Sequence, residues 1–252
     1  MNNQKFDRGV GLIYKYHKSN HSFSKSWRLM LKTICASTEI ELSKWITEKP
    51  VKKNQPKAIF ASCQRFGQGQ SGRIWQAPKG GVWVSAAINR EDSSENNSQL
   101  YGLAVALALV ERIERIGVNV NIKWPNDLLV DGQKLAGILP RLFFRGGKLR
   151  LLRVGVGLNV FNNVPQEGIS LKQIIGDKTM NINFWSSEVL LAIERSLDLL
   201  DNKNFLCSQI EQRLWSRKYI DKETGYKLDI KGIDSSGRLI LFKEDLVKVL
   251  SA

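Results

Sequence analysis

The run Lys123-Trp124-Pro125-Asn126-Asp127, followed by Gly132-Gln133-Lys134-Leu135-Ala136-Gly137-Ile138-Leu139, is the stretch that decides how the centre of this chain folds. It sets two lysines, an aspartate and an asparagine beside tight turns in an otherwise apolar, strand-like sequence. Burying such polar groups costs free energy unless they find partners. Since both lysines are cationic, their natural partner is a small anionic ligand.

The composition is that of a globular enzyme. The chain has 252 residues, of which 42% are hydrophobic, and this suits one sizeable core with a small appended domain. The longest apolar run, Leu103–Val110, is too short to span a membrane, and no secretory segment follows Met1. Three cysteines without a Cys-x-x-Cys pair argue against disulfides and a zinc site. We therefore expect a cytoplasmic protein with no membrane association and no metal site of its own.

The net charge of +14 favours anionic partners such as nucleotides, nucleic acid or an acidic protein. The basic residues are spread over the N-terminal region and over a loop at residues 49–57. They are not interleaved with aromatic residues, as a platform for single-stranded nucleic acid would require. A basic nucleic-acid-binding module without catalysis therefore stays an alternative, but not the preferred one.

Hydrophobic periodicity divides the chain into three regions. Residues 1–26 are weakly patterned and predict a loose arm, residues 27–217 predict the main domain of strands and helices, which contains the lysine stretch, and residues 218–252 predict a small β-module. Alternating or short apolar runs predict strands at Trp27–Cys35, Ala58–Cys63, Gly81–Asn89, Val118–Lys123, Leu128–Val130, Leu135–Phe144, Leu149–Asn159, Tyr226–Ile230, Leu239–Phe242 and Leu246–Leu250. Helical spacing predicts helices from Ser37-Thr38 to Thr47 and at Ser94–Ile116, Phe184–Leu200 and Phe205–Trp215.

The loop Gly67-Gln68-Gly69-Gln70-Ser71-Gly72 matches the dinucleotide pattern G-x-G-x-x-G. That fingerprint requires a helix to begin at the loop, whereas Pro78 and the glycines after it predict extended chain. Successive exposed N–H groups still bind carboxylate or phosphate oxygens, and Arg73 would add a charged donor. Trp75 offers a flat face for an adenine. A glycine-rich hairpin with a core tryptophan is the alternative.

The lysine-containing stretch suits a site that activates a carboxylate. Attack of a carboxylate on the α-phosphate of ATP gives an acyl adenylate and pyrophosphate, and bringing two anions together requires fixed positive charge. Lys134 would neutralise the carboxylate, and Lys123 would meet phosphate oxygens. Asp127 would hold Mg²⁺ indirectly or accept a proton from an incoming amine. Taken singly, either lysine fits better as a solvated residue at a strand end than as a site residue.

Three segments resemble the motifs of biotin protein ligases, in the family's order: Gln64–Trp75, Lys123–Leu139 and Val154–Val160. Ser37-Thr38 is similar to a further family motif, and the resemblance covers roughly residues 27–250. It implies an α+β fold with a mixed sheet covered by helices, as in class II synthetases, and a small C-terminal SH3-like β-barrel. It also implies ATP-dependent activation of biotin as biotinyl-5'-AMP and transfer to a lysine of a biotin carrier protein, with the carrier subunit of acetyl-CoA carboxylase expected.

The resemblance assigns roles to the matched residues. The implied catalytic residues are Lys134, Asp127 and Lys123. The implied biotin-binding residues are Ser37, Thr38, Glu39, Gln64, Gln68, Gly69, Gln70, Lys134 and Gly137. The implied nucleotide-binding residues are Gly67, Arg73, Trp75, Asn126 and Asn159. Biotin, ATP and Mg²⁺ are the implied substrates and cofactor, and a homodimer is in keeping with the family.

The chain departs from the family pattern at Gln68, Gln70 and Ser71, where arginines are usual. Gln70 is neutral at a position that usually supplies a cation to the adenylate, so weaker retention of biotinyl-AMP is expected. The C-terminal module is expected to be truncated. The first 26 residues are too few for a DNA-binding domain, so no specific DNA binding is expected. A lipoate- or octanoate-type acyl ligase of related fold is the second alternative.

Overall fold

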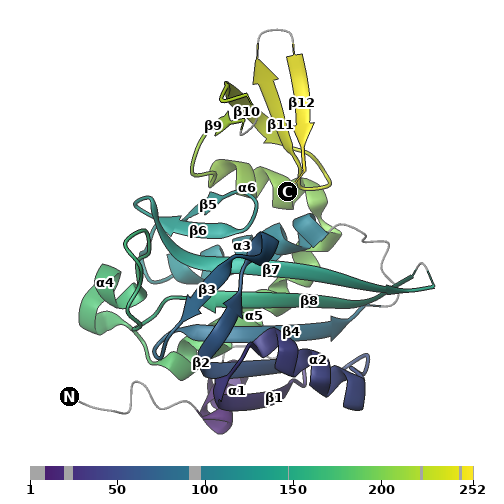
Figure 1. Ribbon diagram of the computed structural model, residues 1–252, viewed down its shortest axis with the longest axis vertical. Helices are drawn as coiled ribbons and strands as arrows, with labels where there is room; N and C mark the ends of the chain where they lie inside the picture. Colours follow the sequence, from purple (N-terminus) through teal and green to yellow (C-terminus); the bar gives the residue numbers. More distant parts are fainter. Residues whose placement is uncertain are drawn as a thin grey trace.

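A mixed β-sheet forms the centre of the protein (Figure 1). The structure is a computed structural model that describes residues 9–19, 25–90, 98–146, 148–221, 224–243 and 246–251. The order along the sheet is β1-β2-β4-β8-β7-β6-β5, and β3 pairs with β2 beside this path. Strand β1 runs parallel to β2, whereas the other neighbours are antiparallel.

The strands of this sheet are β1 (Arg28–Cys35), β2 (Lys57–Gln68), β3 (Ile74–Ala77), β4 (Val82–Asn89), β5 (Asn121–Lys123), β6 (Asp127–Val130), β7 (Gln133–Arg145) and β8 (Lys148–Leu158). The helices are α1 (Val10–Ser19), α2 (Thr38–Glu48), α3 (Ser98–Glu114), α4 (Leu171–Ile175), α5 (Ile182–Asp201) and α6 (Lys203–Gln212), with short 3₁₀ turns η2 (Gln70–Gly72) and η3 (Gly176–Lys178). The C-terminal strands are β9 (Lys218–Ile220), β10 (Lys227–Ile233), β11 (Leu239–Lys243) and β12 (Leu246–Leu250).

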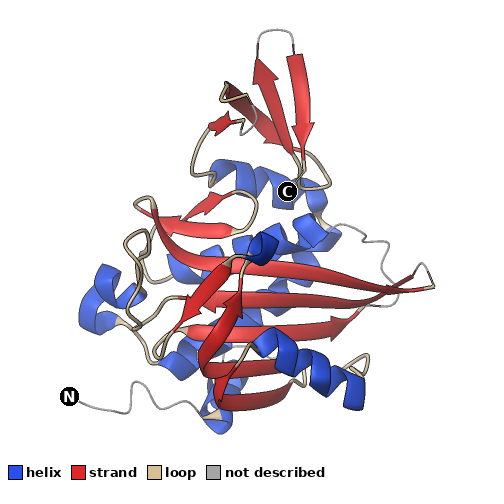
Figure 2. Ribbon diagram, in the orientation of Figure 1, coloured by secondary structure: helices blue, strands red, loops and turns tan. Residues whose placement is uncertain are grey.

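Helices cover both faces of the central sheet. Figures 1 and 2 show α2 in front of the sheet and α3 and α5 behind it. Helix α3 contacts β7 on one side and α5 on the other, so every residue from Leu100 to Val110 is buried. A helix enclosed in this way is apolar all round, as the sequence of α3 is. None of the described helices is long and apolar enough to cross a membrane.

The predicted α+β fold is confirmed, and each predicted strand and helix overlaps an observed one. The short elements β3, α4 and β9 were not predicted, because runs of three to five residues carry too little periodicity. The predicted helix over Ser94–Ile116 is described only from Ser98, since residues 91–97 lie outside the described part of the chain.

The prediction of a loose arm over residues 1–26 is wrong for residues 10–19, which form helix α1 against α5. Ile13 is fully buried, and His17 Nε2 lies 3.0 Å from Glu194 Oε1. The apolar stripe of α1 is short and lies among basic and polar residues, so the sequence alone did not predict this helix. Its packing against α5 shows which residues form the buried face. Residues 1–8 and 20–24 lie outside the described part.

The C-terminal strands form a separate antiparallel sheet in the order β12-β11-β10-β9, above the central sheet in Figure 1. Its buried residues Leu228, Leu239 and Leu241 join the main hydrophobic core. The turn at residues 234–237 anchors the module, because the Gly237 carbonyl accepts a hydrogen bond from Trp124 Nε1 at 2.9 Å. The C-terminal sheet is therefore hydrogen-bonded directly to the run Lys123–Asp127.

We predict that a buried ion pair between α3 and α5 is a weak point of the core. Arg112 and Glu188 are 7% and 3% exposed, and Arg112 Nη2 lies 2.9 Å from Glu188 Oε1. Glu188→Gln should lower the free energy of unfolding by about 3–5 kcal/mol, because it leaves a buried guanidinium without its counter-charge. Urea unfolding measures this loss.

The surface pair Arg90–Asp201 is the matched control, since the side chain of Asp201 is 69% exposed. Asp201→Asn should cost less than about 1 kcal/mol. Equal losses in the two variants would contradict the prediction.

Candidate active site

A cavity of about 250 Å³ opens between the N-terminus of α2, the β2–β3 hairpin and strands β4, β6, β7 and β8. It brings together residues from distant parts of the sequence. The predicted site residues that line it are Ser37, Thr38, Glu39, Gln64, Gln68, Gly69, Gln70, Arg73, Trp75, Asn126, Asp127, Lys134 and Gly137. The lining residues that the sequence analysis missed are Ile74, Val84, Ser85, Ile138, Leu139, Gly155, Val156 and Gly157.

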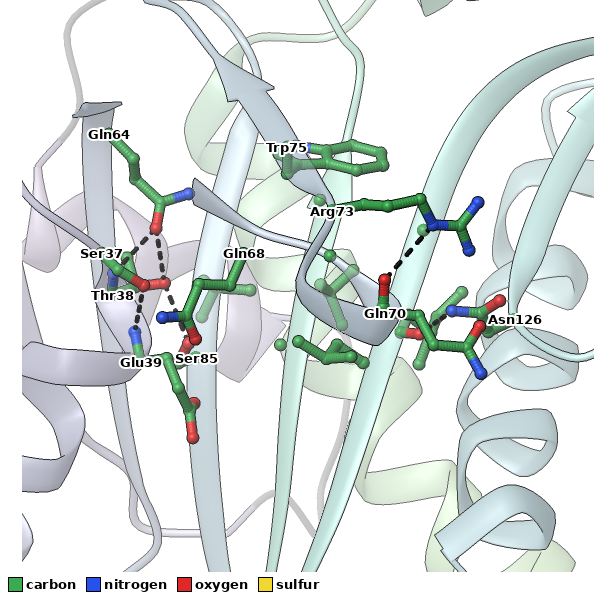
Figure 3. Close-up of a pocket in the computed structure, with 18 of the residues that line it drawn as sticks. Ser37, Thr38, Glu39, Gln64, Gln68, Gln70, Arg73, Trp75, Ser85 and Asn126 are labelled. Carbon is green, nitrogen blue, oxygen red and sulfur yellow. Dashed lines mark hydrogen bonds between the residues drawn. The ribbon is translucent and has the colours of Figure 1, made fainter. Parts of the chain in front are cut away.

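One end of the cavity carries a cluster of hydroxyl and amide groups (Figure 3). Gln64 Oε1 accepts hydrogen bonds from Thr38 N at 2.7 Å and from Thr38 Oγ1 at 3.1 Å. Thr38 Oγ1 also lies 2.9 Å from Ser85 Oγ, and Ser37 caps α2 by accepting from Glu39 N. The Gln64 amide is thereby oriented with its NH₂ group left to donate to a ligand.

One feature of the sequence could have predicted a role for Ser85. It is a single hydroxyl residue within the strand Val82–Asn89, whose other residues are apolar apart from Asn89 at its end. A lone polar side chain in a fully buried strand needs a partner. Its partner, Thr38, lies on another element, so only the tertiary structure identifies the pair.

The other end of the cavity is cationic. Lys134 Nζ lies 2.6 Å from Asp127 Oδ1 and 4.9 Å from the centroid of the Trp75 ring. Figure 3 shows Arg73, Gln70 and Asn126 on this side, across the cavity from the hydroxyl cluster. An ammonium held between a carboxylate and an aromatic face can neutralise an entering anion.

A β-bulge places Lys134 on the cavity face. Lys134 pairs with Leu129 and Ala136 pairs with Leu128, so Leu135 is an extra residue of β7 without a partner on β6. The bulge is held from the other side, because Asn159 N donates to Leu135 O at 3.0 Å and Asn159 Nδ2 donates to Lys134 O at 3.1 Å. Side chains alternate across a strand, so without the extra residue Lys134 would face away from Gly137.

The glycines of the site leave room for Trp75. A Cβ atom added to Gly137 would lie 2.8 Å from the Trp75 ring, and one added to Gly157 would lie 2.6 Å from it. A Cβ atom on Gly67 would lie 2.4 Å from the Trp75 carbonyl oxygen. Trp75 therefore rests directly on backbone, and among the described residues its buried indole N–H has no hydrogen-bond partner.

Three predicted site residues do not line the cavity. Lys123 is exposed on β5, and Gly67 contacts Trp75 in the β2–β3 hairpin. Asn159 is buried, and its side chain is engaged with Lys134 O and with Asn162 Nδ2. The structure thus shows Asn159 supporting Lys134, while ligand contacts of all three residues stay predictions. The described residues contain no group of three or more side chains suited to hold a metal ion.

Comparison with known proteins agrees with this geometry. Residues 40–159 match the model of the biotin/lipoate A/B protein ligase family. The match spans slightly less than half of the chain and includes Gln64, Trp75, Lys134 and Asn159. A Bacillus subtilis member, the bifunctional ligase/repressor BirA, is 36% identical over 129 residues, which are 48% of this chain and 39% of that protein. The chain therefore matches well under half the length of this ligase/repressor.

Other members match over most of the chain. Biotin–protein ligase 2 of Arabidopsis thaliana is 29% identical over 249 residues, covering 91% of this chain and 73% of the plant protein. The structure of a mutant Aquifex aeolicus biotin protein ligase in complex with biotin is 26% identical, with a TM-score of 0.72. That match covers 88% of this chain and 94% of the other, and it confirms the predicted ligase fold.

We predict that Gly157 and Gly155 respond differently to a methyl group. Gly157→Ala forces the Trp75 indole to move, so we expect a loss of about 1–3 kcal/mol in unfolding free energy and a changed tryptophan fluorescence. Gly155→Ala is the matched control on the same strand, because its Cβ would meet Leu139 at an ordinary 3.6 Å. A fluorescence change that persists in a Trp75→Phe background would contradict the assignment.

Proposed function

We propose that the protein is a biotin protein ligase. It activates biotin with ATP as biotinyl-5'-AMP and transfers the biotinyl group to a lysine of a carrier protein, for which the carrier subunit of acetyl-CoA carboxylase is the proposed acceptor. The observation that carries the proposal is the two-ended cavity, with hydroxyl and amide groups at one end and Lys134 at the other. The names of the relatives from Arabidopsis and Aquifex support it.

The cavity matches the two ends of biotin. The ureido ring has one carbonyl and two N–H groups, which complement the donors and acceptors around Gln64, Ser37 and Ser85. The valeryl carboxylate then lies at the cationic end, beside Lys134. The apolar lining residues Val84, Val156 and Ile138 suit the chain between the two ends.

Catalysis follows from neutralising two anions that must react. The Lys134 ammonium lowers the repulsion between the biotin carboxylate and the nucleotide phosphates, and Arg73 adds a guanidinium at the rim. The carboxylate oxygen attacks the α-phosphorus and pyrophosphate leaves. In the second step the acceptor lysine amine attacks the acyl carbon and AMP leaves, with Asp127 placed to accept the proton that the amine loses.

We also propose that Mg²⁺ binds to the protein together with the nucleotide. This ion is usually bound by one or two carboxylates together with substrate phosphates and water, so a cage of protein ligands is not required. Asp127 lines the cavity at the cationic end, and this carboxylate would hold the ion indirectly, through water. The ion would shield phosphate charge. A cytoplasmic location and a homodimer are further parts of the proposal.

A lipoate- or octanoate-type activity is the second candidate. An octanoyl transferase would need a cysteine nucleophile, and none of the three cysteines lines the cavity. Burial raises the pKa values of Cys35 and Cys207 to about 11, so both thiols are protonated at neutral pH. Nothing in the site favours the nucleic-acid alternative.

We predict that Lys134→Met abolishes most adenylate formation. Loss of the fixed ammonium should lower the rate about 100- to 1,000-fold, the usual cost of removing one group that stabilises transition-state charge. Intact-mass analysis of a biotin carrier domain incubated with the protein, biotin, ATP and Mg²⁺ measures transfer. Lys172→Met is the control, because Lys172 is an exposed residue of α4 outside the cavity. Equal rates in both variants would refute the role of Lys134.

We predict that Gln70→Arg slows release of biotinyl-AMP by about tenfold or more, because it adds a charge-assisted hydrogen bond. Gln70 lines the cavity at the start of the η2 turn, so an arginine there reaches the phosphate region. Rapid gel filtration of the preformed adenylate complex measures the release rate. Gln55→Arg adds the same charge outside the cavity. An unchanged release rate in Gln70→Arg would refute the prediction.

A further inference from the structure

A second cavity, of about 390 Å³, lies at the other end of α2 from the candidate active site. Thr38 in the first turn of α2 lines the active-site cavity, whereas Trp45 in the last turn lines this one. Its volume lies in the range of small-molecule sites. Four of its seven lining residues are cationic and none is acidic, so we call it the basic cavity. The seven residues are Arg28, Trp45, Lys49, Pro50, Lys52, Gln55 and Lys57.

Lys57 is the buried cation of the basic cavity, with an exposed fraction of 5%. Its Nζ atom lies 4.5 Å from the centroid of the Trp45 ring. It donates to Trp45 O at 3.5 Å and to Lys49 O, so it caps the C-terminal end of α2. An ammonium group has three N–H donors, and these carbonyl oxygens use two of them. The third donor is left for a ligand.

Helix capping explains Lys57 but not the three cations around it. Arg28, Lys49 and Lys52 are exposed, and in the described part of the chain their side chains make no hydrogen bond or ion pair. Arg28 is the partner of Lys57 in the parallel pair β1–β2, so the two side chains lie on the same face of the sheet. The fold therefore directs several positive charges to one place without a paired carboxylate.

The loop that carries Lys52 is held at both of its ends. Val51 is buried, and Pro56 O accepts a hydrogen bond from Arg28 N at 2.8 Å. Between these anchors, Gln55 N donates to Lys52 O at 3.1 Å and closes a turn. A loop shaped before a ligand arrives loses less conformational entropy on binding, which favours affinity.

The charges around the basic cavity repel one another. Burial lowers the pKa of Lys57, and the charges of Lys49 and Arg28 lower this pKa further. Glu48 acts in the opposite direction, but it is exposed on α2 and does not line the cavity. An anion bound among the cations would relieve their repulsion, because a nearby opposite charge favours the charged form of each amine.

We propose that the basic cavity is a second anion-binding site, which takes a ligand with two or more linked phosphoryl groups. A single phosphate group carries about −1.5 to −2 charges at pH 7 and would neutralise at most half of the four cations, so linked groups match the site better. The face of Trp45 beneath Lys57 is not open to a nucleobase, so the site offers no stacking platform for single-stranded nucleic acid. Binding there is independent of the proposed reaction at the other end of α2.

Calorimetry with inorganic pyrophosphate, on the full chain and without Mg²⁺, measures this binding. Pyrophosphate is also a product of the proposed reaction, so the titrations use Lys134→Met protein, in which the active-site cavity has lost its ammonium. The salt concentration is about 0.15 M, at which charges more than about 8 Å apart are largely screened. Pyrophosphate should bind about tenfold more tightly than inorganic phosphate, because it makes more charge-assisted contacts.

Lys49→Gln combined with Lys52→Gln should weaken pyrophosphate binding about tenfold or more, since two charged donors are lost. Both residues are exposed, so the fold tolerates the change. Lys227→Gln combined with Lys231→Gln is the matched control, because it removes the same charge from exposed positions of β10. The control pair should bind pyrophosphate with an unchanged dissociation constant.

ADP separates two sources of the phosphoryl groups. Equal affinities for ADP and pyrophosphate, both reduced by the Lys49 and Lys52 substitutions, would support a site that recognises the phosphoryl groups alone. Tighter binding of ADP, reduced by the same substitutions, would support a nucleotide as the ligand. Equal weakening in the test and control pairs, or no binding of pyrophosphate at all, would overturn the proposal. Binding of a thymidine oligonucleotide without binding of pyrophosphate would also overturn it.

Discussion

The position of Lys134 depends on one irregularity of the sheet, the bulge at Leu135. A regular β7 would turn either Lys134 or Gly137 away from the cavity, because neighbouring residues of a strand face opposite sides. The extra residue lets both face the same way, and Asp127 joins them from β6 through its pairing with Gly137. The position of the Lys134 ammonium is therefore set first by the register of β6 and β7, and its side-chain contacts with Asp127 and Trp75 follow from that register.

The bulge is stable because its backbone groups find partners outside the β6–β7 pair. Lys134 N donates to Glu167 O, and Lys134 O accepts from Ile169 N and from the Asn159 side chain. The three partners lie in the segment that follows β8. Among them, Asn159 belongs to the Val154–Val160 motif, so this motif supports Lys134 of the Lys123–Leu139 motif. A bulge held at several points keeps the ammonium in place without help from the ligand, which is the preorganisation that electrostatic catalysis requires.

The two ends of the cavity are built by different means. The hydroxyl end depends on the start of α2, where the cap residue Ser37 and its neighbour Thr38 meet β2 and β4 through Gln64 and Ser85. The cationic end depends on strands that carry glycine where Trp75 rests on them. Helix α3 and helix α5 contribute no lining residues. They bury the opposite face of the sheet and so give the strands a rigid base.

The sequence by itself determined most of the secondary-structure elements and predicted which residues form the site. Periodicity located the long strands and helices, and the quoted motifs identified Lys134, Asp127, Gln64 and Trp75 as site residues, all of which line one cavity. The elements are local features that spacing and residue type predict, whereas the site residues were predicted from the resemblance of their motifs to those of a known family. Only the tertiary structure decided the rest: the packing of α1, the partnership of Ser85 with Thr38, the supporting role of Asn159 and the position of Arg28 beside Lys57. Each of these depends on contacts between residues far apart in the chain. Such contacts produce no hydrophobic periodicity, so the sequence pattern does not predict them.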